Sequence, residues 1–171
     1  MIASFRGRAR RLGDDVNTDY IISSARKKET LDENVLKRFL LESLDPSFAA
    51  SVRSGDVLVA GKNFGCGSAM EVAATVILAA GIRVVVAKSF ARSFYRNAIN
   101  NGLVPIECET EQFIEGDVMS ITLDATAIAV TNERTASTEM RPALGGIAGA
   151  ILDAGGLVPY LRRDGRFTPS A

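Results

Sequence analysis

Residues 56–107 read DVLVAGKNFGCGSAMEVAATVILAAGIRVVVAKSFARSFYRNAINNGLVPIE, and the order of segments in this stretch determines the fold class. Three short apolar runs, at 56–60, 83–87 and 103–107, have the length and composition of buried strands. A helical run follows each of the first two, and parallel strands are joined by crossover helices of this kind. The stretch therefore predicts an α/β fold in which these strands pair in parallel.

The segments between these strands carry the signals of a loop and two helices. Residues 61–67 are glycine-rich and follow the first strand directly. Residues 69–80 predict a helix that stops at Gly81. A second helix is expected from an N-cap at Ser89 through Asn101.

The flanking sequence extends this centre on both sides without repeats or low-complexity segments. A chain of 171 residues has room for one compact domain but hardly for two. We therefore expect a single α/β domain over residues 1–171. Its further predicted elements are a weak basic strand at 5–12, a helix at 31–44, a hairpin of 117–123 and 128–131, and two short helices within 147–162, separated by Gly155 and Gly156.

The composition is that of an ordinary soluble globular protein, and it argues against several functions. Apolar residues make up 47% of the chain, and 20 Lys and Arg balance 20 Asp and Glu. Without an excess of positive charge, nucleic-acid binding is disfavoured. No apolar run approaches the roughly 20 residues of a membrane span, and the basic N-terminus lacks the apolar stretch of a signal peptide. We expect a cytoplasmic protein that binds neither nucleic acid nor membrane.

The cysteine and histidine content excludes further chemistry. Cys66 and Cys108 are the only cysteines, and histidine is absent. A disulfide framework is therefore implausible, and no Ser-His-Asp or Cys-His arrangement can be assembled from this chain. A [4Fe–4S] cluster needs three or four thiolates, so any cluster must come from another chain. We expect no metal-binding residue in this chain.

The loop residues Gly65, Cys66, Gly67 and Ser68 precede a predicted helix. Glycines let the backbone approach a ligand and expose successive N–H groups, and the helix end adds partial positive charge. The loop suits a carboxylate or phosphate, or it is a tight turn without a ligand. A dinucleotide fingerprint is incomplete because Met70 stands where the third glycine belongs. Ser68 is either a base whose alkoxide the N–H dipoles stabilise, or the helix N-cap.

Three charged segments offer further contacts. Residues 14–19 combine three carboxylates, an amide and a hydroxyl, which orient a hydroxy acid, bind a metal or form Asx turns. The run Arg-Lys-Lys at 26–28 offers cations for a carboxylate, or forms a solvated loop. The third segment is the expected start of the second helix, which carries Lys88, Ser89 and Arg92. These residues either contact a substrate, or they provide surface charge and a helix N-cap.

Three blocks of the sequence, 13–22, 59–68 and 87–103, resemble in order the small subunits of the 3-isopropylmalate dehydratase and homoaconitase family. The resemblance implies a β/β/α three-layer swivelling domain like the aconitase C-terminal domain. It also implies a large partner subunit that carries a [4Fe–4S] cluster and without which this chain is inactive. The family reaction removes water from a hydroxy-dicarboxylate or tricarboxylate and adds it back with the other regiochemistry, as in leucine biosynthesis.

The same resemblance implies a role for particular residues. Ser68 is the expected catalytic residue, which as an alkoxide takes a proton from the substrate carbon. Residues 23–30 form a loop that sorts substrates by their far end. The expected substrate-binding residues are Gly65, Cys66, Gly67, Asp15, Thr18, Asp19, Arg26, Lys28 and Arg92.

The sequence departs from the family pattern directly after Ser68. The family reads Gly-Ser-Ser-Arg-Glu, whereas this chain has Ala69 and Met70 in place of the second serine and the arginine. Losing a charge-assisted contact to a carboxylate typically costs about 2–5 kcal/mol where the site is desolvated. Either Arg26, Lys28 or Arg92 replaces the arginine, or the substrate differs, or the chain is a weakened or non-catalytic regulatory paralogue.

The cationic residues 25–28 favour a substrate whose far end is polar or anionic, since an isopropyl group prefers apolar neighbours. This pattern keeps homocitrate or a methylated malate as an alternative to isopropylmalate. An isolated chain has an unfilled docking face, and we expect it to be able to form a homodimer.

Overall fold

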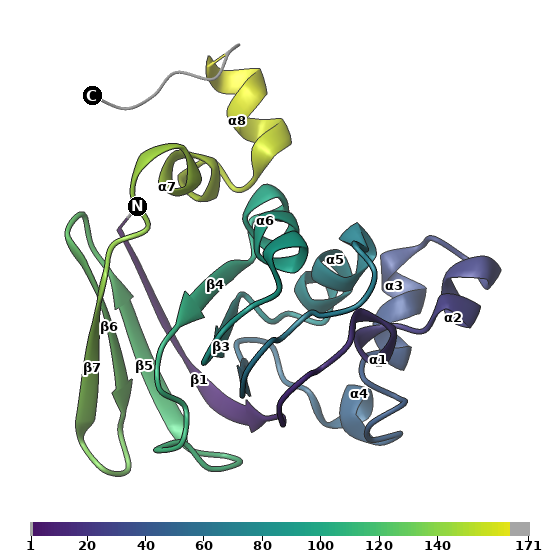
Figure 1. Cartoon of the computed structure of the whole chain (residues 1–171), viewed down its shortest axis with the longest axis horizontal. Coiled ribbons are helices and arrows are strands. Elements are labelled where there is room, and N and C mark those ends of the chain that lie inside the picture. The colour runs from purple at the N-terminus through teal and green to yellow at the C-terminus, as the bar shows by residue number, and fades with distance from the viewer. Residues whose placement is uncertain (1, 165–171) are drawn as a thin grey trace.

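The computed structural model describes residues 2–164, whose strands form one seven-stranded sheet in the order β4-β3-β2-β1-β5-β6-β7 (Figure 1). β1 pairs in parallel with β2 and antiparallel with β5, so it joins a parallel half to an antiparallel half. The predicted parallel pairing and the predicted hairpin are thereby confirmed. The strands are β1 (Ala3–Arg11), β2 (Val57–Ala60), β3 (Val84–Ala87), β4 (Val104–Glu107), β5 (Val118–Leu123), β6 (Ala127–Asn132) and β7 (Ser137–Pro142).

The helices fall into two groups on either side of the parallel strands. Figure 1 shows α1–α5 on the side away from β5–β7, and α7 and α8 beside α6. The two predicted short helices of the tail are present as α7 and α8. The helical segments are α1 (Thr18–Ile21), α2 (Ser24–Glu29), α3 (Glu33–Leu36), η1 (Lys37–Phe39), α4 (Phe48–Ser51), α5 (Glu71–Ala79), α6 (Arg92–Asn101), α7 (Gly146–Asp153) and α8 (Leu157–Asp164).

Alternate residues of the parallel strands face two separate cores. Leu58 and Val85 pack into a core with the apolar residues of α1, α3, α4 and α5. Val57 and Val84 face the opposite way, into a core with β5, β6, α7 and α8. Successive side chains of a strand point to opposite faces, so both faces of these strands are buried. The result is the expected β/β/α arrangement: antiparallel strands, parallel strands and helices.

The sheet is curled, and its two edge strands approach each other. The backbone N–H of Glu109, just after β4, donates to the Glu139 carboxylate of β7 at 3.0 Å. This contact joins the ends of the strand order. The curl closes the second core around the apolar side chains of β5 and β6.

The prediction of one helix over residues 31–44 is wrong in extent, because only the short segments α3 and η1 form there. Leu41 takes a left-handed backbone conformation with φ of 58°, and its N–H donates to the carbonyl of Ile21 at 2.9 Å. Leu40 and Leu41 are fully buried in the first core. The chain therefore turns at this point to bury both leucines, which a continued helix would not do.

The two crossover helices begin later than predicted. α5 begins at Glu71 and α6 at Arg92. Ser89 is not an N-cap, because its hydroxyl accepts the backbone N–H of Asn63 at 2.8 Å and Ala91 occupies the cap position. Within residues 2–164, no helix combines the length and the apolar character that crossing a membrane requires.

Candidate functional site

The loop Gly65–Ser68 is held in place by the segment 13–19, which leads from β1 into α1. The backbone N–H of Thr18 donates to the carbonyl of Cys66 at 2.8 Å. The Thr18 hydroxyl donates to the carbonyl of Ser68 at 2.9 Å. Thr18 is 1% exposed, so its side chain is a buried anchor that determines where Ser68 lies. The structure thus brings together two segments that lie far apart in the sequence.

The residues before α6 support the same loop from another direction. The N–H of Phe64 donates to the carbonyl of Ser89 at 3.0 Å, and the N–H of Ala91 donates to the carbonyl of Phe64 at 2.9 Å. The Phe64 ring meets the ring of Phe94 edge to face, with centroids 5.0 Å apart. Gly65 has φ of 77°, and a Cβ there would lie 2.2 Å from Cγ of Phe94. The aromatic cluster therefore leaves space only for glycine at position 65.

Gly67 lies against the start of α1, just as Gly65 lies against Phe94. Its φ is 88°, and a Cβ there would lie 2.4 Å from Oδ1 of Asn17. The Asn17 side chain caps α1 by accepting the backbone N–H of Asp19 at 2.9 Å. We did not predict Asn17 as a site residue, although an asparagine before Thr-Asp is a typical N-cap.

Ser68 presents an exposed hydroxyl on this fixed loop. Among residues 2–164 that hydroxyl has no hydrogen-bond partner, whereas the Ser68 carbonyl is anchored by Thr18. Within the same residues the backbone N–H groups of Gly67, Ser68 and Ala69 also form no hydrogen bond. Met70 occupies the N-cap position of α5, so Ser68 does not cap that helix. A hydroxyl beside free N–H groups and a helix N-terminus can be stabilised as an alkoxide.

The acidic residues of 14–19 form turn and loop contacts. The Asp14 carboxylate accepts the N–H of Lys62 at 2.7 Å, and Asp15 accepts the side-chain amide of Asn63 at 2.7 Å. Asp19 accepts the Ser24 hydroxyl at 2.6 Å, which joins α1 to α2. The described part of the chain contains no group of three His, Cys, Asp or Glu that could hold a metal ion. In this structure these carboxylates therefore shape the loop surroundings.

Arg26 lies in α2, a helix where the sequence predicts only a loop. Its guanidinium donates to Glu42 at 2.9 and 3.1 Å and lies 3.8 Å from the centre of the Phe39 ring. Hydrogen bonding and the nearby charge of Glu42 raise the pKa of Arg26 above its usual value. A guanidinium held in this way is oriented by the protein itself and contacts no residue of Gly65–Ser68 in the described structure.

No hydrogen bond or ion pair within residues 2–164 joins the other predicted cations to the loop. Lys28 is exposed on α2 and forms no hydrogen bond or ion pair within residues 2–164. Arg92 is the first residue of α6 and lines an open pocket of about 560 Å³ together with Tyr95, Arg96 and others. Lys27 belongs to the predicted cationic run 26–28, although it is not among the predicted substrate-binding residues. It is the cation of α2 that reaches the segment after Ser68, because its ammonium contacts the sulfur of Met70.

The two cysteines are unsuited to an iron–sulfur cluster. Cys66 is half-buried in the loop, while Cys108 is buried at the end of β4. Burial raises the pKa of the Cys108 thiol to about 12, which keeps it protonated at neutral pH. A [4Fe–4S] cluster is bound by three or four thiolates, so the residues of this chain do not fit one.

Comparisons with known proteins agree with this geometry. The family model of the aconitase C-terminal domain matches residues 23–111. The methanogen homoaconitase small subunit of Methanocaldococcus jannaschii is 46% identical over 92% of this chain and 91% of its own length. The 3-isopropylmalate dehydratase small subunit of Oleidesulfovibrio alaskensis is 44% identical over 92% and 94% of the two chains.

A solved structure agrees as well. The crystal structure of a 3-isopropylmalate dehydratase from Methanocaldococcus jannaschii superposes with a TM-score of 0.87 at 43% identity. The match covers 94% of this chain and 95% of that one. The chain therefore belongs to the aconitase C-terminal domain family, among the small subunits of 3-isopropylmalate dehydratases and homoaconitases.

Proposed function

We propose that this chain is the small subunit of a 3-isopropylmalate dehydratase, in which it completes the active site on a large partner subunit. The observation that carries the proposal is the exposed Ser68 hydroxyl, fixed on a loop whose neighbouring N–H groups are free in the described structure. Dehydration of a malate-type acid needs a base that takes a proton from the carbon next to the carbon bearing the hydroxyl. Ser68 as an alkoxide is suited to that transfer.

The substrate-facing contacts follow from the same loop. The N–H groups of Gly67, Ser68 and Ala69 can donate to a substrate carboxylate, as backbone donors do at helix N-termini. Thr18 holds the loop and Asn17 lies against Gly67, while Asp15 and Asp19 shape the surroundings of the loop. We assign the [4Fe–4S] cluster to the large subunit, because this chain has only two cysteines.

A homoaconitase small subunit is the second candidate, and two observations favour it. The methanogen homoaconitase small subunit is 46% identical to this chain. The sequence of α2 also carries three consecutive cations at 26–28, which suit an anionic far end. Against this, Glu42 and Glu29 pair with Arg26, so α2 is less cationic than its sequence suggests.

The test is anaerobic co-expression with a cluster-bearing large subunit, followed by copurification and a substrate panel. The panel contains the unsaturated acids derived from isopropylmalate, homocitrate and methylmalate. Preferred hydration of isopropylmaleate supports the dehydratase, and preferred hydration of homoaconitate supports the second candidate. A stable complex that hydrates none of these acids refutes both and leaves a regulatory subunit.

A further inference from the structure

We propose that Lys27 binds a carboxylate of the substrate beside the Gly65–Ser68 loop, in place of the arginine that the family carries at position 70. This inference rests on the proposed function and identifies the cation of that site. The sequence offers Arg26, Lys28 and Arg92 for the role, and the structure connects none of them to the loop. Lys27 belongs to the same helix as Arg26 but extends in another direction.

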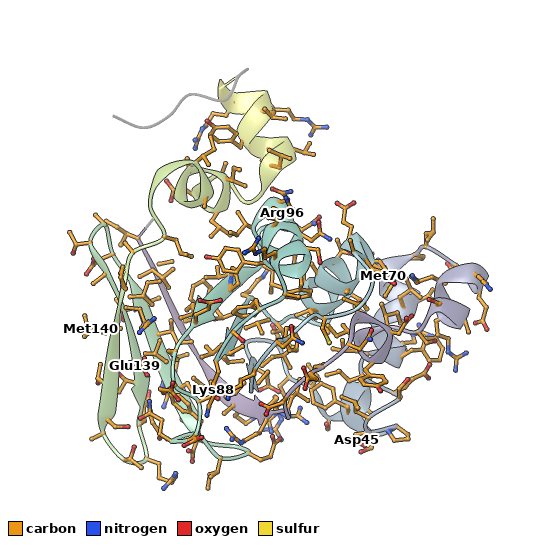
Figure 2. The ribbon with its side chains drawn as sticks, viewed as in Figure 1. Asp45, Met70, Lys88, Arg96, Glu139 and Met140 are labelled. Carbon is orange, nitrogen blue, oxygen red and sulfur yellow. The ribbon has the colours of Figure 1, made fainter. Side chains whose placement is uncertain are left out.

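The position of Lys27 is set by one backbone contact and one side-chain contact. Its backbone N–H donates to the carbonyl of Ser23, the N-cap of α2, at 3.3 Å. The Lys27 ammonium contacts the sulfur of Met70, the N-cap residue of α5. Figure 2 shows Met70 where α5 borders the short helices that precede β2. Met70 follows Ser68 by two residues, so the ammonium lies next to the segment that carries the free N–H groups.

The ammonium of Lys27 lacks a partner of opposite charge within the described residues. Its polar contact there is a thioether, which is a weak acceptor, while an ammonium offers three donors. Glu42 and Glu29 are engaged by Arg26, and the exposed Glu71 forms no ion pair in the described structure. A half-buried cation of this kind is stabilised by an incoming anion.

The side chain of Met70 allows Lys27 to lie at the start of α5. Its side chain is 8% exposed and fills the space at the start of α5 without supplying a charge. An unbranched thioether adapts to the aliphatic stem of a neighbouring lysine. The cation at this point of the site thus comes from α2 rather than from α5. We therefore expect that an arginine at position 70 can supply the positive charge when Lys27 is removed.

The test uses the complex with the large subunit and compares Lys27→Met with Lys37→Met. Lys37 contacts Asn34 at 3.5 Å in the same group of short helices and takes no part in the site. We expect Lys27→Met to lower kcat/KM about 10- to 100-fold, mainly through KM, since hydrogen bonds to charged groups have this worth. Lys37→Met should stay within about twofold, and Lys27→Arg within about fivefold, because it keeps the charge.

A double variant tests whether the positive charge can be moved from position 27 to position 70. Adding Met70→Arg to Lys27→Met should restore kcat/KM at least about fivefold, because a bidentate guanidinium then replaces the lost ammonium. Wild-type kinetics for Lys27→Met, or a loss of activity that follows a loss of copurification, would overturn the assignment while the proposed function stands. An inactive wild-type complex would instead remove the proposed function and the role of Lys27 with it.

Discussion

Thr18 and Ser68 are joined by a hydrogen bond of 2.9 Å from a buried hydroxyl to the carbonyl of the exposed serine. The bond leaves the Ser68 side chain free while it fixes the backbone that carries it. It also links α1 to the residues that precede α5, so the position of the catalytic candidate depends on a residue fifty positions away.

Thr18→Val tests this anchor, because valine keeps the shape of threonine and removes the donor. The loss of one hydrogen bond is worth about 0.5–1.5 kcal/mol. We expect kcat of the assembled complex to fall about 3- to 10-fold, since about 1.4 kcal/mol corresponds to a factor of ten. The matched control is Thr75→Val in α5, where the hydroxyl donates to Val72 at 3.4 Å. Equal effects on kcat in both variants would show that the Thr18 bond does not position the site.

Gly67→Ala tests the close approach of the loop to Asn17. Alanine there meets both a left-handed backbone and the Asn17 side chain at 2.4 Å. We expect a loss of activity of more than about 100-fold, because a misplacement of the loop by about 1 Å has an effect of this order. Circular dichroism and copurification should remain close to wild type.

Gly116→Ala is the control for the backbone conformation alone. Gly116 has φ of 85°, and a Cβ added there would meet no atom within 4 Å. The left-handed conformation should cost this variant about 1–2 kcal/mol of unfolding free energy without a change in kcat. Equal activity of the two variants would refute the steric argument for Gly67.

Asp117 gives a pH prediction that concerns stability. Arg134 donates to its carboxylate at 2.6 and 3.0 Å, and Asn132 donates at 2.7 Å. These hydrogen bonds, led by those of Arg134, lower the pKa of Asp117 to about 2. A lowered pKa stabilises the folded state above the ordinary value of 3.8, and this stabilisation is lost as the pH falls from about 4 to 2.

Asp117→Asn should remove that part of the acid dependence. Urea unfolding between pH 7 and pH 2 should show a shallower decline in the variant than in the wild type. At pH 7 the variant should be less stable by about 1–3 kcal/mol, the usual effect of weakening a buried charged hydrogen-bond partner. Parallel curves for the two proteins would contradict the assigned role of Asp117.

The two cysteines should differ in reactivity towards a thiol reagent. Cys108 is 4% exposed, and the pKa of about 12 keeps its thiol protonated at pH 8. Cys66 is half-buried in the loop and accessible by comparison. We expect one modified thiol in the native chain and two in denaturant, with mass spectrometry locating the first at Cys66. Rapid native modification of Cys108 would contradict the packing at the end of β4.

The sequence predicts the parallel half of the sheet well because its strands are continuous apolar runs buried on both faces. It does not predict β7, in which four of six residues are exposed and no apolar alternation remains. α2 is missed for a related reason, since none of its residues is buried. A short helix without an apolar face is indistinguishable from a loop by periodicity.

In the candidate site too, some features follow from the local sequence and others depend on the fold. Glycine spacing points to Gly65–Ser68, because positive φ and close approach require glycine there. The sequence names Lys27 within a cationic run but does not predict its contact with Met70, because that contact spans 43 positions and depends on how α2 packs. The pairing of Arg26 with Glu42 cannot be predicted either, because the sequence shows Arg26 only as part of a run of cations. Local chemistry can be inferred from the sequence, whereas pairing between distant segments requires the fold.

The decisive experiment for the catalytic role of Ser68 is the turnover of the complex that carries Ser68→Ala. Ser47→Ala serves as control, because Ser47 lies outside the loop and hydrogen-bonds to Asp45. If Ser68 is the base, copurification stays unchanged and kcat falls about 10²- to 10⁴-fold, the usual contribution of a positioned general base. An intact Ser68→Ala complex with the kcat of the wild type would contradict the assignment of Ser68 as the base.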